Sequence, residues 1–299
     1  MQRLSLENKA KLACLIAGVA WGLFWIPLRG LERAGIHELW ITVVYFLVPC
    51  CLIAPVVLVR WRRFLEGGTS LQITLFMSGC ALSLYSASIV YTDVVRAIML
   101  FYLMPIWSAI LARMFLGEAI TAIRILAMLL AALGMLVLFG LGAGVPLPRN
   151  AGDWMGLLAG FFWAVAVIRL RKRPDLHVLD LTAGFFVWGL ILCTTMAVLF
   201  ASNHAPSIAQ TAPALPMLAL FVVLLVIPGT FASLWGPKFI SPTVSGLLFM
   251  TEIVVGAISA AILSGEPFGT REALGVTLIA GASMIEPLRD FTRSRRASV

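Results

Sequence analysis

Two segments decide the fold: residues 15–30 read LIAGVAWGLFWIPLRG, and residues 157–172 read LLAGFFWAVAVIRLRK. When the two segments are aligned end to end, Trp21 falls on Trp163 and Arg29 on Arg171. Shorter matches support this internal repeat: Ala-Ser-Ile at 87–89 with Ala-Ser-Leu at 232–234, and Gly-Glu at 117–118 with Gly-Glu at 265–266. The two halves of the chain therefore share one design.

The whole chain is as apolar as these segments. Of its 299 residues, 61% are hydrophobic and 12% are charged, whereas an average soluble protein has about 25% charged residues. A soluble domain of this size cannot cover its surface with so few charges. The composition predicts an all-α polytopic membrane protein in a lipid bilayer. It excludes a nucleic-acid-binding protein despite the net charge of +8, because no soluble basic face is available.

Apolar windows of about 20 residues, the length that crosses a bilayer core of about 30 Å, predict ten transmembrane helices. We expect two five-helix repeats, in residues 1–147 and 148–299. Because five is odd, the second repeat enters the membrane from the opposite side, which makes an inverted repeat. The expected spans are 11–30, 39–59, 71–91, 95–116, 122–142, 152–170, 180–201, 214–236, 242–264 and 271–288.

The orientation follows from the positions of Lys and Arg. One set of alternate connections, which includes both termini, holds 17 of the 22 basic residues. Basic residues concentrate on the cytoplasmic side, so both termini are predicted to be cytoplasmic. A cleaved signal peptide is the alternative for the N-terminus, but the first apolar run has no small-residue cleavage pattern. The five cysteines lie inside expected spans and form no zinc-binding spacing, so no metal is expected.

A family resemblance rests on the fourth and ninth spans. RAIMLFYLMP at 96–105, continuing to FLGEAIT at 115–121, resembles the C-terminal part of an EamA module, and ILSGEP at 262–267 repeats its end. Two such modules resemble a member of the drug/metabolite transporter superfamily, and the Trp-rich first span is similar to YddG-type aromatic amino acid exporters. The resemblance implies a cofactor-free secondary transporter of the cell inner membrane. It implies export of aromatic or broadly neutral amino acids. The inverted repeat predicts transport by alternating access, and both repeats lie in one chain, so a monomer is expected to suffice.

Glu252 is the exceptional charge, because it falls near the middle of span 242–264 while the other carboxylates lie at span ends or in loops. A charge at mid-membrane costs about 2.5–3.5 kcal/mol on insertion scales. Ser245 and Ser259, each seven residues away, are expected on the same helical face. We expect Glu252 to line a cavity and to bind a substrate ammonium, a proton, or both in turn. The alternative is a neutral carboxyl hydrogen-bonded to another helix. Glu118 and Glu266 are expected to mark helix ends.

Aromatic residues form the second group of candidates, because rings can stack on an aromatic substrate or hold an ammonium over a π face. Core packing is the alternative for each ring. The candidates for substrate binding are Trp21, Trp25, Tyr85, Ser88, Tyr102, Trp163, Ser245 and Glu252. The candidates for hinges, with static kinks as the alternative, are Pro27, Pro105, Pro228 and Gly229. Glycines at spacing four, such as Gly18 and Gly22, are expected to let helices approach closely.

The sequence lacks the motifs of several enzyme classes. No phosphate-binding loop, zinc-protease motif or nucleophile elbow occurs, so an enzyme is not expected. The remaining alternatives are a multidrug or nucleotide-sugar carrier of the same fold and a membrane partner subunit that transports nothing. Glu252 permits proton coupling, whereas a facilitative carrier needs no titrating group.

Overall fold

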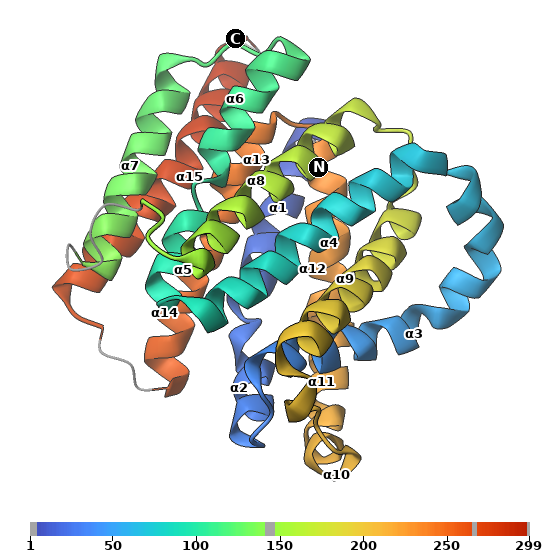
Figure 1. Cartoon of the computed structure of the whole chain (residues 1–299). Coiled ribbons are helices and arrows are strands. Elements are labelled where there is room, and N and C mark those ends of the chain that lie inside the picture. The colour runs from blue at the N-terminus through green and yellow to red at the C-terminus, as the bar shows by residue number, and fades with distance from the viewer. Residues whose placement is uncertain (1–4, 141–146, 265–267, 298–299) are drawn as a thin grey trace.

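The computed structural model describes residues 5–140, 147–264 and 268–297, and every regular element in these ranges is helical (Figure 1). The first half contains α1 (Leu6–Gly22), α2 (Trp25–Arg33), α3 (Glu38–Glu66), α4 (Gly68–Tyr91), α5 (Val94–Phe101), α6 (Met104–Leu116) and α7 (Ala122–Phe139). The second half contains α8 (Ala151–Lys172), α9 (Val178–Ala201), α10 (Ile208–Thr211), α11 (Leu215–Phe221), α12 (Ile227–Trp235), α13 (Pro242–Phe249), α14 (Thr251–Ser264) and α15 (Thr270–Ala297). Short helical turns η2 to η5 connect α9 to α13.

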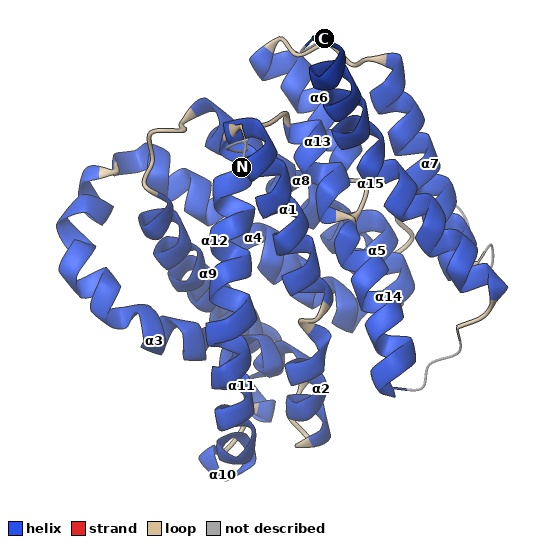
Figure 2. Cartoon of the chain, turned by 180° about the vertical axis from the view of Figure 1, so that it is seen from behind, coloured by secondary structure: helices blue, strands red, loops and turns tan. Residues whose placement is uncertain are grey.

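Two helix pairs flank a central group (Figures 1 and 2). α7 packs along α15 on one side, and α3 packs along α9 on the other. Between them, α1 of the first half packs against α12, α13 and α14 of the second half. In return, α8 of the second half packs against α4, α5 and α6 of the first. Each half therefore packs on the other with corresponding helices.

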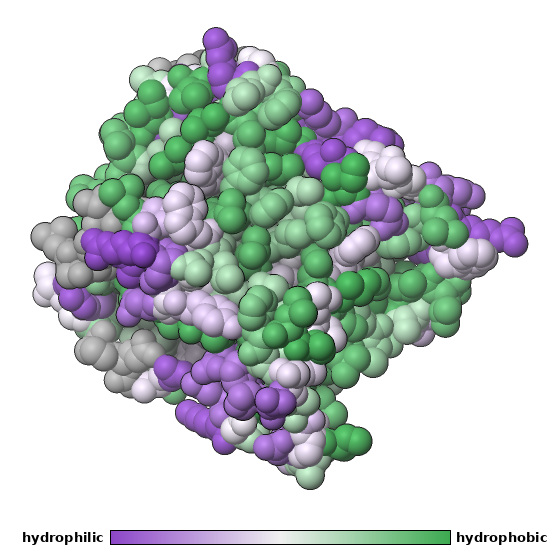
Figure 3. All heavy atoms as spheres, viewed as in Figure 1, coloured by the Kyte–Doolittle hydropathy of each residue, from purple (hydrophilic) through white to green (hydrophobic). Residues whose placement is uncertain are grey.

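The helices present an apolar exterior. Large apolar side chains are exposed on many helices, for example Val59 at 84% and Leu129 at 64%. In Figure 3 an apolar band crosses the visible face and separates hydrophilic residues at its upper right from those at its lower left. Such a band is typical of a surface that faces lipid. The chain is therefore a multi-pass membrane protein.

Within the described ranges, nine helical segments are long and apolar enough to cross a membrane. They correspond to the first nine expected spans. The tenth, 271–288, lies in α15, where the stretch free of charged side chains runs only from Ala273 to Ile285. This stretch is shorter than the roughly 20 residues that cross a bilayer core. Part of the expected fifth span, residues 141 and 142, lies outside the described ranges.

Helix starts repeat between the halves in detail. HELWITVVYF at 37–46 aligns without a gap on HVLDLTAGFF at 177–186. The His37 Nδ1 atom accepts a hydrogen bond from the backbone N–H of Leu39, and the His177 Nδ1 atom accepts one from Leu179, both at 3.3 Å. Each histidine thus satisfies an otherwise unpaired N–H in the first turn of its helix. The two halves share their capping chemistry as well as their apolar pattern.

Several expected spans are interrupted. Leu23 and Phe24 separate α1 from α2, Tyr102 and Leu103 separate α5 from α6, and a π-helical turn, η4 (Val222–Val226), precedes α12. The hinge candidates Pro27, Pro105 and Pro228 each lie in the first turn that follows an interruption, and Gly229 comes directly after Pro228. Proline is tolerated there because the first N–H groups of a helix have no partner within it. By contrast, α3 continues through both of its prolines.

The ninth span is interrupted at Met250, between α13 and α14, where the sequence has neither proline nor glycine. When the Gly-Glu pair at 117–118 is aligned on the pair at 265–266, Tyr102 falls on Met250. The two interruptions therefore fall at the same position of the repeat.

Glycines allow α1 and α8 to lie directly against these interruptions, as the spacing-four pattern predicts. A Cβ at Gly22 would lie 2.7 Å from the carbonyl oxygen of Glu252, and one at Gly18 would overlap the Thr251 hydroxyl. In the other half, a Cβ at Gly160 would overlap the carbonyl oxygen of Phe101. Each long helix therefore contacts the interrupted helix of the opposite half through glycine.

Gly160→Ala is expected to destabilise the protein by about 1–3 kcal/mol, because the added methyl group meets a backbone oxygen that cannot rotate away. The readout is thermal unfolding of the purified protein in detergent. Gly30→Ala is the matched control, since a Cβ at Gly30 in α2 meets nothing within 4 Å. Equal unfolding temperatures for the two variants would contradict the close contact.

Candidate functional site

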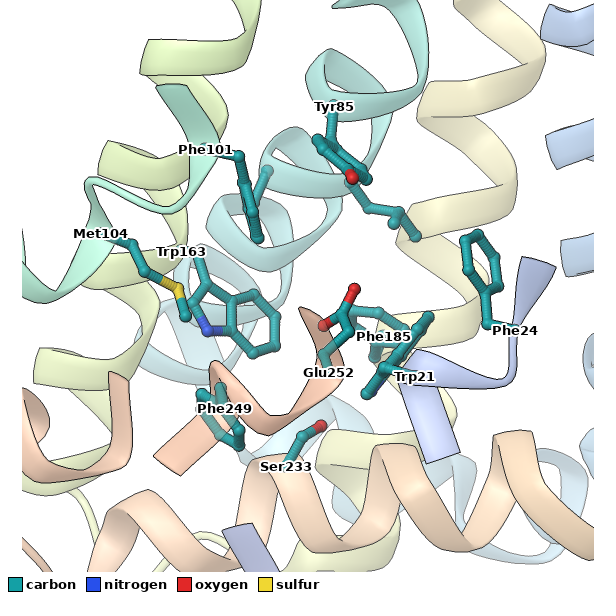
Figure 4. Close-up of a pocket in the computed structure, with 12 residues that line it drawn as sticks. Trp21, Phe24, Tyr85, Phe101, Met104, Trp163, Phe185, Ser233, Phe249 and Glu252 are labelled. Carbon is teal, nitrogen blue, oxygen red and sulfur yellow. The ribbon is translucent and has the colours of Figure 1, made fainter. Parts of the chain in front are cut away.

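A pocket lies at the centre of the helix bundle, where the two halves meet (Figure 4). It encloses about 610 Å³ of empty space, part of which is open at its mouth. Trp21 and Trp163 each pack against both large hydrophobic cores of the protein, so the pocket lies between these cores. The residues that line it are Trp21, Phe24, Ala81, Leu82, Tyr85, Phe101, Met104, Trp163, Phe185, Ser233, Phe249 and Glu252.

Aromatic rings form a continuous wall of the pocket. Trp21 lies 5.6 Å from Phe24 and 6.3 Å from Phe185, measured between ring centroids. Trp163 lies 6.4 Å from the same Phe185 and 6.1 Å from Phe249. All four pairs are tilted or edge-to-face, the geometries that aromatic quadrupoles prefer. Phe185 therefore joins the tryptophan of one half to the tryptophan of the other.

Glu252 is the one charged residue among the described residues that line the pocket. It lies in the first turn of α14, directly after the interruption at Met250, and its carboxyl group points into the space that the rings surround (Figure 4). Gly22 holds α1 against the backbone of Glu252, which fixes where this turn begins. The interruption and the glycine contact thus place a carboxylate among π faces.

Two further tyrosines stand behind the ring wall. Tyr45 packs on Phe24 at 5.1 Å and Tyr102 packs on Phe101 at 5.1 Å between ring centroids. Both hydroxyl groups are buried within electrostatic range of the Glu252 carboxyl. The Tyr102 hydroxyl is close enough to the Glu252 carboxyl to interact with it as a hydrogen-bond donor. The Tyr45 hydroxyl has no hydrogen-bond partner among the described residues, and a buried hydroxyl without a partner costs about 1–3 kcal/mol.

Residues of the lining correspond to one another across the repeat. Trp21 and Trp163 are equivalent in the alignment of the first and sixth spans. Alignment of the two Gly-Glu pairs makes Phe101 equivalent to Phe249 and Met104 equivalent to Glu252. Since all six line the same pocket, the two halves build it from matching positions.

Four of the eight substrate-binding candidates line the pocket: Trp21, Tyr85, Trp163 and Glu252. Trp25 lies elsewhere, because its indole N–H donates to the Ser259 hydroxyl at 3.0 Å and its ring lies 5.1 Å from the Arg29 guanidinium carbon. Ser88 and Tyr102 are buried close to the pocket but are not among its lining residues.

Ser245 is not among the residues that line the pocket, and an interruption separates its helix from that of Glu252. Ser245 belongs to α13, where its hydroxyl donates to the carbonyl oxygen of Pro242 at 2.9 Å. Glu252 belongs to α14, on the other side of the interruption at Met250. Ser259 is on α14 with Glu252, but its hydroxyl is engaged by Trp25.

The sequence does not identify eight residues of the lining, seven of which are apolar: Phe24, Ala81, Leu82, Phe101, Met104, Phe185, Ser233 and Phe249. An apolar residue in an apolar span does not differ in character from its sequence neighbours, so nothing in the sequence singles it out. The repeat supplies the only signal: Phe101 aligns with Phe249, and Phe185 aligns with Tyr45 when the two histidine-capped helix starts are superimposed.

The two glutamates that are expected to mark helix ends are Glu118 and Glu266. Glu118, just past the end of α6, pairs with Arg124 at 3.1 Å and accepts a hydrogen bond from Ser241. Glu266 lies outside the described residues. In the part of the chain that the structure describes, no group of three or more His, Cys, Asp or Glu side chains is close enough to hold a metal ion.

Comparisons with known proteins agree with this architecture. The sequence pattern of the EamA-like transporter family matches residues 8–140 and again residues 150–285. A solved structure titled only "Crystal structure of protein" superimposes with a TM-score of 0.76 at 17% identity, over 97% of this chain and 99% of that chain. At that identity the likeness shows the fold alone. No curated protein sequence matches. Because the two matches cover most of the chain, the protein belongs to the EamA-like transporter family, within the drug/metabolite transporter superfamily, and carries two EamA modules.

Proposed function

We propose that this protein is a secondary transporter that carries small amines with an aromatic or apolar body, amino acids among them, through the pocket around Glu252. One observation carries the proposal: among the described residues, a single carboxylate faces a pocket that is otherwise lined by rings and small or apolar side chains. A carboxylate pairs with an ammonium, and π faces attract the same cation by about 2 kcal/mol or more once it is desolvated.

Alternating access between the two modules is the proposed mechanism. In this proposal, residues 1–147 and 148–299 form inverted five-helix modules, and α15 serves as the tenth span although its uncharged stretch is short. The reciprocal packing of α1 and α8 and the matched interruptions at Tyr102 and Met250 support it. A pocket between two such modules can open to either side when one module rocks against the other. Glu252 then binds one ammonium or one proton at a time, which couples the two fluxes.

The membrane placement follows the distribution of basic residues. Both termini lie in the cytoplasm and the protein lies in the cell inner membrane, with export as the direction for amino acids. Both modules are present in one chain, so a monomer suffices for transport.

A second candidate is a carrier of organic amines that lack a carboxylate. The described lining of the pocket contains no Lys, Arg or His. The carboxylate of a zwitterionic amino acid would find no cationic partner there, and leaving a charge unpaired in a poorly solvated site is costly. An amine without a carboxylate avoids this cost.

A competition panel separates these cargoes. Phenylalanine and phenethylamine share the ring and the ammonium, and 3-phenylpropionate keeps the ring and the carboxylate alone. Phenethylamine is expected to compete at least as well as phenylalanine, and 3-phenylpropionate is expected not to compete. The measurement is inhibition of labelled-amine counterflow in proteoliposomes that contain this protein alone. Competition by 3-phenylpropionate equal to that of the amine would contradict the role of Glu252, and an absence of any flux would favour a partner subunit.

A further inference from the structure

Arg169 of α8 is a charged residue that takes no part in the aromatic pocket. It lies three residues, or about 5 Å, before the end of α8 at Lys172, and it is half-buried against the first turns of α4. In Figure 1 this end of α8 and the start of α4 lie together at the upper right, where hydrophilic residues gather in Figure 3. The ends of membrane-spanning helices lie at the depth of the lipid headgroups. Arg169 is therefore placed near the depth of the lipid phosphates.

The guanidinium of Arg169 is held in one orientation by α4. Its Nε atom donates to the Thr74 hydroxyl at 3.0 Å, and its Nη2 atom donates to the Ser70 carbonyl oxygen at 2.9 Å. Thr74 is buried, and its hydroxyl donates to the same Ser70 oxygen at 2.9 Å. The third nitrogen, Nη1, has no acceptor among the described residues. Since a guanidinium is planar and rigid, the N–H groups of Nη1 point in a fixed direction.

The charge of Arg169 has no counter-charge in the part of the chain that the structure describes. The charged group that acts on it is Arg173, four residues further on, which repels it. Arg173 itself is neutralised by Asp175 at 2.7 Å. By contrast, Arg60 at the end of α3 pairs with Asp180 of α9 at 2.6 Å. A partly desolvated charge without a partner is costly, so a counter-charge for Arg169 is expected from outside the chain.

The surface of α4 beside this site is apolar and exposed. Ile73 is 43% exposed and Phe76 is 36% exposed, and they lie in the turns of α4 that contain and follow Thr74. Exposed apolar side chains of a membrane-spanning helix contact acyl chains. A phospholipid places its phosphate at the helix ends and its acyl chains along the span, whereas a free phosphate makes no use of an apolar surface. The combination favours a lipid phosphate.

The end of α3 adds positive charge next to the start of α4. α3 ends at Glu66 and α4 begins at Gly68, so the exposed Arg62 and Arg63 lie within two turns of this start. Trp61 beside them is 53% exposed, as is typical of a residue at the membrane interface. Clustered arginines at this depth attract anionic lipids in preference to zwitterionic ones.

We propose that Arg169, held by Ser70 and Thr74, binds the phosphate of an anionic phospholipid. The phosphate oxygens accept hydrogen bonds from Nη1, and the acyl chains lie along Ile73 and Phe76. Because α4 belongs to the first half of the chain and α8 to the second, the bound lipid stabilises the packing of one half on the other. The site is separate from the aromatic pocket, and the inference does not rest on the proposed function.

The test measures the unfolding temperature of the purified protein in mixed micelles of a neutral detergent with phosphatidylglycerol or with phosphatidylcholine. Phosphatidylglycerol is expected to raise the unfolding temperature of the wild type by about 2–4 °C more than phosphatidylcholine does, the range for a ligand that binds the folded state alone. Inorganic phosphate without the anionic lipid is expected to have no effect. In Arg169→Gln the difference between the two lipids is expected to disappear.

Arg173→Gln is the matched control, because Arg173 lies on the same end of the bundle and already pairs with Asp175. It is expected to keep the full difference between the lipids. Thr74→Val, a second variant, keeps the charge of Arg169 and removes the hydroxyl that orients it, so it is expected to reduce the difference.

An Arg169→Gln variant that keeps the wild-type difference overturns the inference. An equal loss in Arg173→Gln also overturns it, since the effect would then be a general attraction of anionic lipid to basic residues. A full effect of inorganic phosphate alone overturns the assignment to a lipid. If Arg169→Gln does not fold, an unchanged difference in Thr74→Val overturns the site.

Discussion

Glu252→Gln is expected to reduce amine transport at least thirtyfold while the protein stays folded. No other described residue of the pocket lining carries a charge, so nothing replaces the lost carboxylate. Removing one partner of a desolvated charge pair costs about 2–5 kcal/mol, and each 1.4 kcal/mol is a factor of ten in affinity. Glutamine keeps the size and the hydrogen-bonding oxygen, which separates loss of charge from loss of packing.

The measurement is counterflow of labelled phenethylamine into proteoliposomes, together with the unfolding temperature in detergent. Glu272→Gln is the control, because Glu272 lies at the start of α15 and pairs with the exposed Arg271 at 2.6 Å. The control is expected to transport as the wild type does. Normal transport by Glu252→Gln would make Glu252 a structural carboxyl and would remove the basis of the proposed function.

The sequence predicts much of the fold because lipid imposes a strong pattern. Apolar windows locate the first nine spans, and the repeat predicts that the two halves share one design. Three of the observed helix interruptions are each followed within one turn by a proline, namely Pro27, Pro105 and Pro228. These signals are local, so they can be read without knowing which helices touch.

The sequence does not predict the interruption at Met250, which has no proline or glycine beside it. Thr251 and Glu252 lie against Gly18 and Gly22 of α1, in the opposite half of the chain. Gly18 and Gly22 mark a close approach of α1, but no local signal identifies Met250 as its partner. Only the alignment of Met250 with Tyr102, through the Gly-Glu pairs, points to it.

The candidate site shows the same contrast between residues with a local sequence signal and residues placed by tertiary contacts. Glu252 stands out because a charge in an apolar span is rare. Phe185 does not stand out, although it joins Trp21 to Trp163 at the centre of the ring wall. The packing of α9 against α4 and α12 brings it there, and this arrangement exists only in the folded chain.

The equivalence of Met104 and Glu252 has a functional consequence. Both residues follow an interruption of the repeat by two positions, counted from Tyr102 and from Met250. Both residues line the pocket. Met104 is 2% exposed, so its side chain contacts protein rather than lipid or bulk water. If the pocket lies on a two-fold axis between the modules, a carboxylate at either position faces the same bound solute.

Exchanging the two residues is therefore expected to restore a site that the single change destroys. Glu252→Met alone should lose amine counterflow at least thirtyfold, as the glutamine variant does. Adding Met104→Glu should recover at least tenfold of that loss, because the carboxylate again faces the ring wall, now from α6. Leu82→Glu combined with Glu252→Met is the matched control, since Leu82 also lines the pocket but lies in α4, away from the interruptions. Recovery that is equal in both double variants would show that any carboxylate in the pocket suffices. No recovery from Met104→Glu, in a protein with the unfolding temperature of the single variant, would show that the modules do not present equivalent positions to the cargo.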